Sequence, residues 1–492
     1  MKGVVSSGST EATKAGLFAL EKGGNAIDAA ICAQLAAFVA EPLLTGFAGA
    51  GIASLRVDGE LQLVDMFTTM PGMGREINSC EFEAIDIDFG PATQRFFVGL
   101  GSIATPTMPQ GLIYLHKNFA RLPLKTLVQP AIHLARNGFQ ASRGLETVVK
   151  LLFPIVMRSP VMERWFGRQG RAIREGELCV LSEMEKDLYN FAHYGEELFQ
   201  ANDYRKALDA ISNQTLLSRE DIGEYSPKRR FHRTKDFCDH QIQLCSEPSI
   251  GGLILDDLLE PMHDIPSDPL GFEAVQLLGA RLRAVFGEQQ SYSKTVLQRL
   301  TEQFIPNSSG FTTHLSVVDA EGNAIGITSS LGESAGVVLN NSGIILNNFL
   351  GEADVAPPMA RTKAGRRLLT MCSPTLVTSA SSNDIMVYGS GGSNRIASAI
   401  FQGIVYSLAY DYPIEKVVSA PRMHVTGDVL QLETFARSPK TILQLQENYG
   451  ERLREFSTPN MFFGGLHVAG INNGILSGMG DQRRAGVSGL SK

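Results

Sequence analysis

The chain has 492 residues, of which 43% are hydrophobic and 19% are charged, and its formal net charge is −7. This composition is ordinary for a globular protein, and the length suits two or three domains or one large layered body. The acidic balance argues against a nucleic-acid-binding protein, because such proteins need a basic stripe.

The N-terminus and the cysteines indicate a cytoplasmic protein. Residues 1–8 lack the apolar core of a signal peptide. The most apolar window, residues 26–44, contains two acidic residues and a proline, so it does not predict a membrane span. The six cysteines are irregularly spaced without a CxxC pair, which indicates reduced thiols and no zinc site. We therefore expect a cytoplasmic location, no metal, and no membrane or nucleic-acid partner.

The first 40 residues predict two helices. Ser9 can cap the first helix, and Gly23-Gly24 ends it. Asn25 can cap the second helix, which covers residues 26–39 and is apolar nearly all round, so we expect it to be buried. Asp28 is an unusual residue on such a helix, and we expect it to make a structural hydrogen bond.

A hairpin and a helical region are predicted next. Residues 52–57 and 61–65 form the hairpin, because Asp58-Gly59 between them is a strong turn signal. Residues 110–215 have a mainly helical pattern, and a loop at 248–252 opens another helix. The N-terminal part of the chain is therefore expected to be rich in helices.

The pattern changes at residue 312. Residues 270–304 are helical in pattern, and 305–310 form a polar segment in which a chain can be cut and its ends can part. Strands are predicted at 313–318 and 324–330, with a turn at 320–323. Further strands are expected at 336–346, 374–380 and 384–389, and a helix at 394–410. We predict one layered α/β body to which a helix-rich part, 1–311, and a strand-rich part, 312–492, both contribute.

Thr312 stands at this change of character. A Thr-Thr pair at the start of a strand is also explained by β-branched packing. If the bond between Phe311 and Thr312 were cut, Thr312 would carry a hydroxyl and a free α-amino group. A hydroxyl is a weak nucleophile that needs an adjacent base. An α-amino group, with a pKa of roughly 7.7–8.0, can serve as that base.

Single motifs in this chain are weak, but their order is specific. Residues 389–395, for example, admit either a phosphate cradle or a tightly packed turn, since they form neither a Walker A motif nor a GxGxxG. The informative segments are 23–30, 41–51, 122–124, 130–135, 137–139, 312–319, 322–324, 343–348, 373–375, 420–424 and 481–486. In this order, and over essentially the whole chain, they resemble the γ-glutamyltransferases of the N-terminal-nucleophile hydrolases.

The resemblance implies an architecture and an assembly. The fold would be a four-layer αββα sandwich, an α/β (α+β) fold. The chain would split itself into the pieces 1–311 and 312–492, which would remain together as a heterodimer, and a dimer of that heterodimer stays open. The substrate would be a small molecule, and no cofactor would be needed.

The resemblance also assigns catalytic roles. Thr312 falls on the nucleophile, which would first attack the carbonyl of Phe311 and later the carbonyl of the substrate. Ser330 falls on a second threonine that positions the nucleophile, and it keeps the hydroxyl. Gly392 and Ser393 fall on the two positions whose backbone N–H groups form the oxyanion hole. A serine in place of the second glycine preserves the N–H donor.

The substrate pocket departs from the family pattern. The resemblance places six residues there: Phe67, Gly332, Asn348, Glu352, Thr370 and Met371. Phe67 replaces the arginine that holds the substrate carboxylate, and a phenyl ring cannot form a bidentate clamp. Gly332 replaces an asparagine, and Thr370-Met371 replaces a serine pair. Glu352 keeps the charge of an aspartate that would meet the substrate amine.

Three functions remain open at this point. The first is an amide hydrolase or acyltransferase that acts through Thr312 on a substrate other than a γ-glutamyl compound. The second is cleavage of a C–C bond beside an oxalyl-type carbonyl, or of an oxamate-type amide. The third is an unprocessed, inactive homologue. Two neighbouring polar residues are expected to have supporting roles. His314 is expected to be structural, and Arg395 to support the oxyanion loop.

Overall fold

The computed structural model describes residues 2–74, 82–88, 93–260, 264–286, 311–352, 355–356, 363–379 and 382–491. The polar segment predicted at 305–310 and the second half of the helix predicted at 270–304 lie outside these residues. Within the described part of the chain, no helix is both long and apolar enough to span a bilayer.

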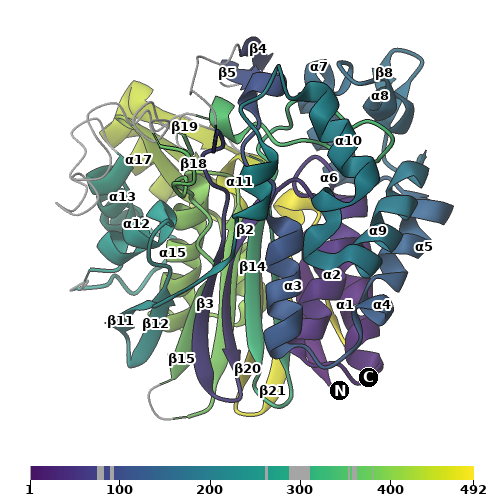
Figure 1. Ribbon diagram of the computed structural model, residues 1–492. Coiled ribbons are helices and arrows are strands. Elements are labelled where there is room, and N and C mark those ends of the chain that lie inside the picture. Colours follow the sequence, from purple (N-terminus) through teal and green to yellow (C-terminus); the bar gives the residue numbers. More distant parts are fainter. Residues whose placement is uncertain are drawn as a thin grey trace.

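Two antiparallel sheets lie face to face at the centre of the molecule (Figure 1). The first sheet has the strand order β10-β3-β2-β14-β13-β1-β22, and the second has the order β11-β12-β15-β16-β20-β21. The strands of the first sheet are β1 Gly3–Ser7, β2 Ala50–Val57, β3 Glu60–Met66, β10 Lys228–Arg230, β13 Thr312–Asp319, β14 Ala324–Ser330 and β22 Val487–Leu490. Those of the second are β11 Arg233–Phe237, β12 His240–Leu244, β15 Thr375–Ser379, β16 Ile385–Gly391, β20 Gly465–Asn472 and β21 Ile475–Met479.

Helices cover both outer faces of this pair of sheets. The helices α1 Thr10–Glu21 and α2 Ala26–Ala40 contact the first sheet, whereas α12 Ile250–Leu258, α15 Arg395–Leu408 and α16 Ile414–Ser419 contact the second. Figure 1 shows the strands running between these two groups of helices. The arrangement is the four-layer αββα sandwich, so the predicted fold is confirmed.

Additional elements surround the sandwich. The helical region predicted at 110–215 consists of α3 Met108–Phe119, α4 Leu124–Leu127, α5 Gln129–Asn137, α6 Arg143–Leu151, α7 Phe153–Val156, α8 Pro160–Phe166, α9 Ser182–Tyr194 and α10 Asn202–Ile211, followed by α11 Arg219–Gly223. The helices α13 Phe272–Phe286 and α17 Pro439–Tyr449 flank a small sheet of β17 Met423–Thr426, β18 Val429–Glu433 and β19 Leu453–Phe456. Two-stranded pieces complete the described elements: β4 Glu83–Asp88 with β5 Thr93–Val98, β6 Phe139–Gln140 with β9 Leu178–Cys179, and β7 Gly167–Arg168 with β8 Arg171–Ala172.

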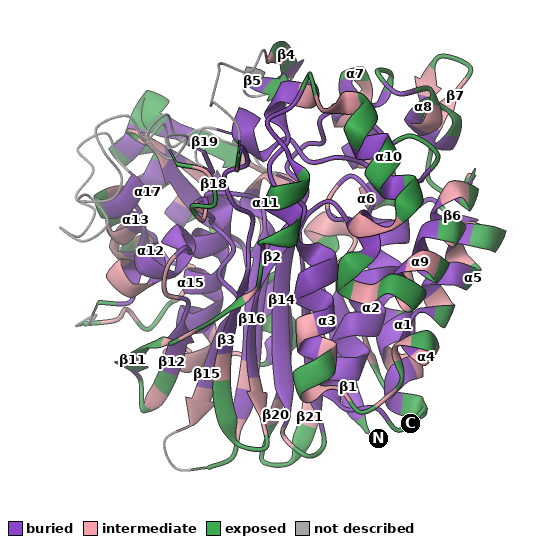
Figure 2. Cartoon of the chain, in the orientation of Figure 1, coloured by how far each residue is buried: buried purple, intermediate pink, exposed green. Residues whose placement is uncertain are grey.

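The helix α2 is held by its N-terminal residues, as its sequence predicts. The side chain of Asn25 accepts from the backbone N–H groups of residues 27 and 28, and Asp28 accepts in return from the N–H of Asn25. This capping box satisfies donors that a helix leaves unpaired. Asp28 also accepts from the N–H groups of Arg121 and Leu122. All residues of α2 are buried (Figure 2), so the helix forms part of the core.

The hairpin of β13 and β14 positions the predicted nucleophile. Its turn is held by Asp319, whose carboxylate accepts from the N–H groups of Glu321 and Asn323. The resulting register places Thr312 directly opposite Ser330. In an antiparallel pair, residues that face each other project on the same side of the sheet, so the two hydroxyl side chains are neighbours.

One strand prediction is wrong. Residues 336–346 were expected to form a strand, but they make only an isolated bridge between Val338 and Ile345. Gly336 and Asn341 adopt positive φ angles of 73° and 58°, which interrupt an extended conformation. The apolar side chains of this segment are buried in the core, so its pattern reflects packing rather than pairing.

The ends of the described chain meet in the first sheet. Strand β1 lies between β13 and β22. The N–H of Gly3 donates to the hydroxyl of Ser491, and the N–H of Ser491 donates to the carbonyl of Gly3. Figure 1 shows both ends at the same corner of the molecule.

Candidate active site

The peptide bond before Thr312 is engaged by Ser330. The Ser330 hydroxyl donates to the carbonyl oxygen of Phe311 at 2.9 Å, and it accepts from the N–H of Gly332 at 2.9 Å. The two hydrogen bonds form one chain from a backbone donor, through the hydroxyl, to the carbonyl. Linked hydrogen bonds of this kind polarise the carbonyl group that accepts the last of them. The carbonyl carbon of Phe311, next to Thr312, therefore becomes a better electrophile.

The loop after β16 approaches Thr312 from the second sheet. Gly392 and Ser393 have φ angles of 120° and 49°, and helix α15 begins two residues later. A side chain at Gly391 would place its Cβ 2.0 Å from the carbonyl oxygen of Thr312, so only glycine permits this approach. The loop and the start of helix α15 therefore lie close to the backbone of Thr312, and a helix N-terminus favours negative charge.

One cavity joins most of the predicted residues. Together with the solvent at its opening, it encloses about 290 Å³ of space that protein atoms do not fill. Of the residues predicted from sequence, it is lined by Phe67, Thr312, Ser330, Glu352, Thr370, Met371 and Ser393. These come from the ends of strands in both sheets and from the segments that follow them. The structure thus brings the catalytic and substrate-binding candidates to a single place.

Comparison with known proteins identifies the family. A sequence model described as "Gamma-glutamyltranspeptidase" matches residues 12–290 and 276–490. The chain belongs to the gamma-glutamyltranspeptidase family. The glutathione hydrolase proenzyme of Escherichia coli (strain K12) is 25% identical over 92% of this chain and 86% of its own length. The acylase ACY 1 proenzyme of Pseudomonas sp. (strain SE83) is 26% identical over 99% of this chain and 93% of its own.

A solved structure in the same group has the same fold. The cephalosporin acylase from Bacillus halodurans superposes with a TM-score of 0.79 at 22% identity, covering 99% of this chain and 95% of the acylase. The chain is thus a gamma-glutamyltranspeptidase family member, in a group of hydrolases and acylases, with the N-terminal-nucleophile hydrolase fold.

Three other predicted residues lie next to the cavity in this family member without lining it. Gly392 precedes Ser393 in the loop, and Gly332 supplies the N–H that orients Ser330. The side chain of Asn348 accepts from the N–H of Glu333 at 2.7 Å and donates to its carboxylate at 3.0 Å. Asn348 therefore holds the turn that follows Ser330.

The geometry explains why a glycine stands at position 332. Its φ angle is 68°, and a Cβ there would lie 2.1 Å from Oδ1 of Asn348 and 2.5 Å from Oε1 of Glu352. The asparagine of the family pattern has no room at this position. The contacts of Asn348 and Glu352 with position 332 therefore exclude an asparagine side chain there.

The pocket wall near Phe67 is aromatic. The Phe67 ring lies 5.4 Å from the ring of Phe349 at an interplanar angle of 50°, and both residues are 1% exposed. Phe349, Val355, Cys372 and Ile396 also line the cavity, and sequence reasoning did not select them. Phe349 directly follows the matched segment 343–348, so its apolar character was visible in the sequence.

His314 has a structural environment. It lies between the two sheets, where its ring nitrogens are 2.8 Å from the hydroxyl oxygens of Thr328 and Ser316. Burial, with a smaller effect from His467, keeps the pKa of His314 well below its ordinary value. The ring is therefore neutral at pH 7 and serves as a hydrogen-bonding link between β13 and β14.

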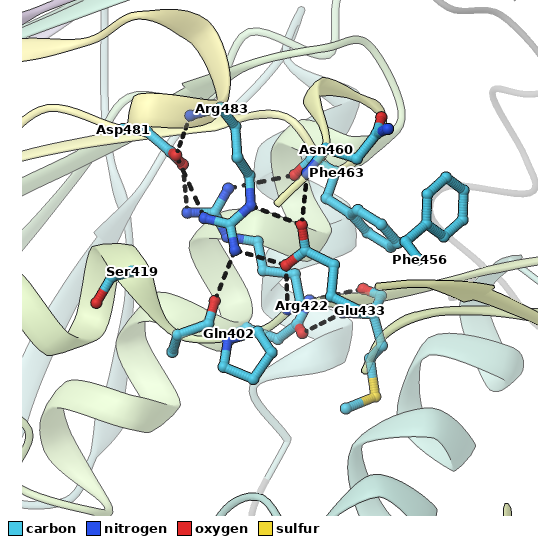
Figure 3. A network of polar contacts seen from close by, with 12 residues as sticks. Gln402, Ser419, Arg422, Glu433, Phe456, Asn460, Phe463, Asp481 and Arg483 are labelled. Atoms are coloured by element: carbon cyan, nitrogen blue, oxygen red, sulfur yellow. Dashed lines mark hydrogen bonds and ion pairs between the residues drawn. The ribbon is translucent and has the colours of Figure 1, made fainter. Parts of the chain in front are cut away.

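A buried network of ion pairs joins Arg422, Glu433, Asp481 and Arg483 (Figure 3). Arg483 pairs with Glu433 at 2.5 Å and with Asp481 at 3.3 Å, and Arg422 pairs with Asp481 at 2.5 Å. Burial alone would raise the pKa of Asp481, but the two arginines and backbone donors hold it below its ordinary value. Asp481 also accepts from the N–H of Leu466, on the strand beside β16.

Arg484 extends this network toward the nucleophile. Its guanidinium lies against Gly391 and Gly392, with Nη2 3.0 Å from the position of a Cβ on Gly392. Among the described residues, its Nε and Nη1 have no hydrogen-bond partner. Burial lowers the pKa of Arg484 to about 10, so it stays charged at neutral pH. Sequence reasoning matched segment 481–486 but gave this arginine no role.

No metal site accompanies these groups in the described residues, where no cluster of three or more histidine, cysteine, aspartate or glutamate side chains could hold an ion.

Proposed function

We propose that this chain is the precursor of an N-terminal-nucleophile hydrolase that cuts itself between Phe311 and Thr312. The observation that carries the proposal is the hydrogen bond from Ser330 to the Phe311 carbonyl, made beside the Thr312 hydroxyl and the loop of Gly392 and Ser393. A nucleophile, a polarised carbonyl and backbone donors are the parts that acyl transfer requires.

Maturation proceeds through an ester. The Thr312 oxygen attacks the carbonyl carbon of Phe311, and the C–N bond to Thr312 breaks as that nitrogen takes up a proton. Phe311 is then esterified to the Thr312 side chain. Water hydrolyses the ester, which leaves a carboxylate on Phe311 and a free α-amino group on Thr312.

The same oxygen then acts on the substrate. The α-amino group accepts the hydroxyl proton as Thr312 attacks an amide carbonyl, and the leaving amine receives a proton. The N–H groups of Gly392 and Ser393 stabilise the oxyanion, and the charge of Arg484 behind the loop adds to this. Water, or an acceptor amine, releases the acyl group from Thr312.

The relatives support the reaction class. The Escherichia coli relative is a glutathione hydrolase proenzyme, and the Pseudomonas relative is an acylase proenzyme. We infer the same class for this chain, with a substrate other than a γ-glutamyl compound because Phe67 stands in place of the arginine clamp.

A denaturing gel with intact-mass measurement tests the proposal. The purified wild-type chain should give two pieces that meet at residues 311 and 312, and a Thr312→Ala variant should stay whole. The small piece should begin with Thr312 on N-terminal sequencing. A wild-type chain that stays whole after long incubation identifies the protein as an unprocessed homologue and overturns the proposal.

A further inference from the structure

We propose that the cavity beside Thr312 accepts a compact, uncharged apolar acyl group and rejects acyl groups that carry a carboxylate. This inference rests on the proposed function, because the acyl group is the part of the substrate that Thr312 would hold. It goes beyond the loss of γ-glutamyl recognition by naming the chemistry that replaces it.

The cavity wall is mainly apolar. Apart from the residues already assigned to catalysis, its lining consists of the apolar residues Phe67, Phe349, Val355, Met371 and Ile396, together with Cys372, Thr370 and the acidic Glu352. Phe67, Phe349 and Ile396 are each 1% exposed, and the two phenyl rings pack against each other. This wall is fixed by core packing, since Phe67 and Phe349 belong to one buried cluster and Ile396 to another.

None of the described residues that line the cavity carries a positive charge. The charged groups close to Phe67 in the sequence are already paired. The carboxylate of Asp65 is fully buried and binds Arg230 at 2.9 Å and Arg367 at 3.1 Å. Arg367 is also stacked over the ring of Tyr225. Arg230 and Arg367 therefore already pair with Asp65 near the end of β3.

The polar groups of the segment 370–373 are also engaged. The hydroxyl of Thr370 accepts from the N–H of Cys372 at 3.0 Å, and the hydroxyl of Ser249 donates to the carbonyl of Cys372. The hydroxyl of Ser373 donates to the carbonyl of Met371. The segment is held rigidly by its own contacts and presents the Met371 side chain to the cavity.

A substrate carboxylate against this wall would lose its hydration next to the acidic residue Glu352 and without direct contact with a cation, because Arg484 lies behind the loop of Gly391 and Gly392. This loss is unfavourable. An apolar acyl chain gains free energy by leaving water for such a wall. The space of about 290 Å³ beside this wall includes open solvent, so small acyl groups, from butyryl to phenylacetyl, are the probes of choice.

Four p-nitroanilides with the same leaving group test the inference on the processed wild-type protein: butyryl, phenylacetyl, glutaryl and γ-glutamyl. The value of kcat/KM for the better of the two neutral acyl groups should exceed that for either carboxylate-bearing group by at least about tenfold. An oxalyl anilide serves as a further anionic probe and should be among the poor substrates. Faster release from any anionic substrate overturns the inference and leaves self-processing and the role of Thr312 intact.

Two variants locate the selectivity. Phe67→Arg supplies the missing charge and should move the preference toward glutaryl by at least about tenfold. Phe67→Leu, the control, keeps an apolar wall and should keep the wild-type order. If Phe67→Arg leaves the order unchanged while Thr312 is processed normally, the wall at Phe67 does not set the preference and the inference fails.

A binding measurement keeps the inference testable if no anilide is turned over. Calorimetric titration of the purified protein with phenylacetamide and with glutaramate compares neutral and anionic acyl groups directly. Tighter binding of phenylacetamide supports the inference, and tighter binding of glutaramate overturns it. The absence of both processing and turnover would count against the proposed function separately.

Discussion

Ser330 contributes one hydroxyl to two contacts, since it accepts from Gly332 and donates to Phe311. We expect Ser330→Ala to slow self-cleavage by about two- to tenfold, because it removes a hydrogen bond to the Phe311 carbonyl worth about 0.5–1.5 kcal/mol. The time course of the whole chain on denaturing gels measures this rate.

Ser330→Thr is the matched control, because it keeps the hydroxyl and should recover most of the rate. Processing of Ser330→Ala at the wild-type rate would contradict the role given to this hydrogen bond.

Sequence alone could place some site residues and not others. Thr312 and Ser330 were placed by the family resemblance over the whole chain, and the local turn between β13 and β14 explains why they face each other. Phe349 and Ile396 reach the cavity only after segments distant in sequence have packed. Arg484 escaped notice for the same reason, since its neighbours Gly391 and Gly392 lie on another strand and loop.

At the level of elements, α2 depends on one buried carboxylate. Asp28 accepts from the N–H groups of Asn25, Arg121 and Leu122. We expect Asp28→Ala to lower the free energy of unfolding by about 2–4 kcal/mol, because it removes a cap and leaves buried donors unpaired. Urea denaturation measures the change.

Ser142→Ala provides the comparison. Ser142 caps the more exposed helix α6 through a single bond to the N–H of Leu145, so its loss should cost about 1 kcal/mol. Equal costs for the two variants would show that Asp28 acts only as an ordinary cap.

Elements with local signals were predictable. A few adjacent residues determine each of these features: the caps of α1 and α2, the turn between β2 and β3, and the turn between β13 and β14. The segment 336–346 has an apolar pattern that predicted a strand. Its apolar side chains instead pack in the core, and the segment pairs with no neighbouring strand. The strands after residue 410 were not assigned from the sequence. One of them, β20, is the inner neighbour of the edge strand β21 in the second sheet and pairs with β16 on its other side.

At the scale of the molecule, both sheets combine strands from either side of the proposed cleavage site. The first sheet takes β1, β2, β3 and β10 from before Phe311 and β13, β14 and β22 from after it. We expect the two pieces to remain associated after cleavage, since separating them would break both sheets and the core between them.

Size-exclusion chromatography of the processed protein should give one species containing both pieces in native buffer and two species in concentrated urea. Separation of the pieces in native buffer would contradict the shared architecture.

Buried neutral histidines should make the whole molecule sensitive to acid. Burial lowers the pKa of four histidines, to about 4 for two of them: His232 and His467, with His314 and His424 also lowered. The unfolded chain takes up protons near pH 6.5 where these folded residues do not, so stability is lost as the pH falls below 6.5. Glu11, Glu41 and Asp187 act in the opposite direction, because burial raises the pKa of each carboxyl, to about 6 for Asp187.

Each such histidine contributes about 1.4 kcal/mol per pH unit below 6.5, so we expect the free energy of unfolding to fall between pH 7.5 and 5.5. Urea denaturation at several pH values measures this slope, and His467→Asn should reduce it. A free energy of unfolding that rises over this interval would contradict the neutral state of these residues.

The meeting of residues 3 and 491 beside β13 allows the chain to be rewired. A short linker between these ends, with the chain opened between residues 311 and 312, would give a circular permutant that starts at the nucleophile. Removal of an initiator methionine would then expose the α-amino group of Thr312 without any self-cleavage. In such a permutant, the effect of Ser330→Ala on substrate turnover could be measured separately from its effect on maturation.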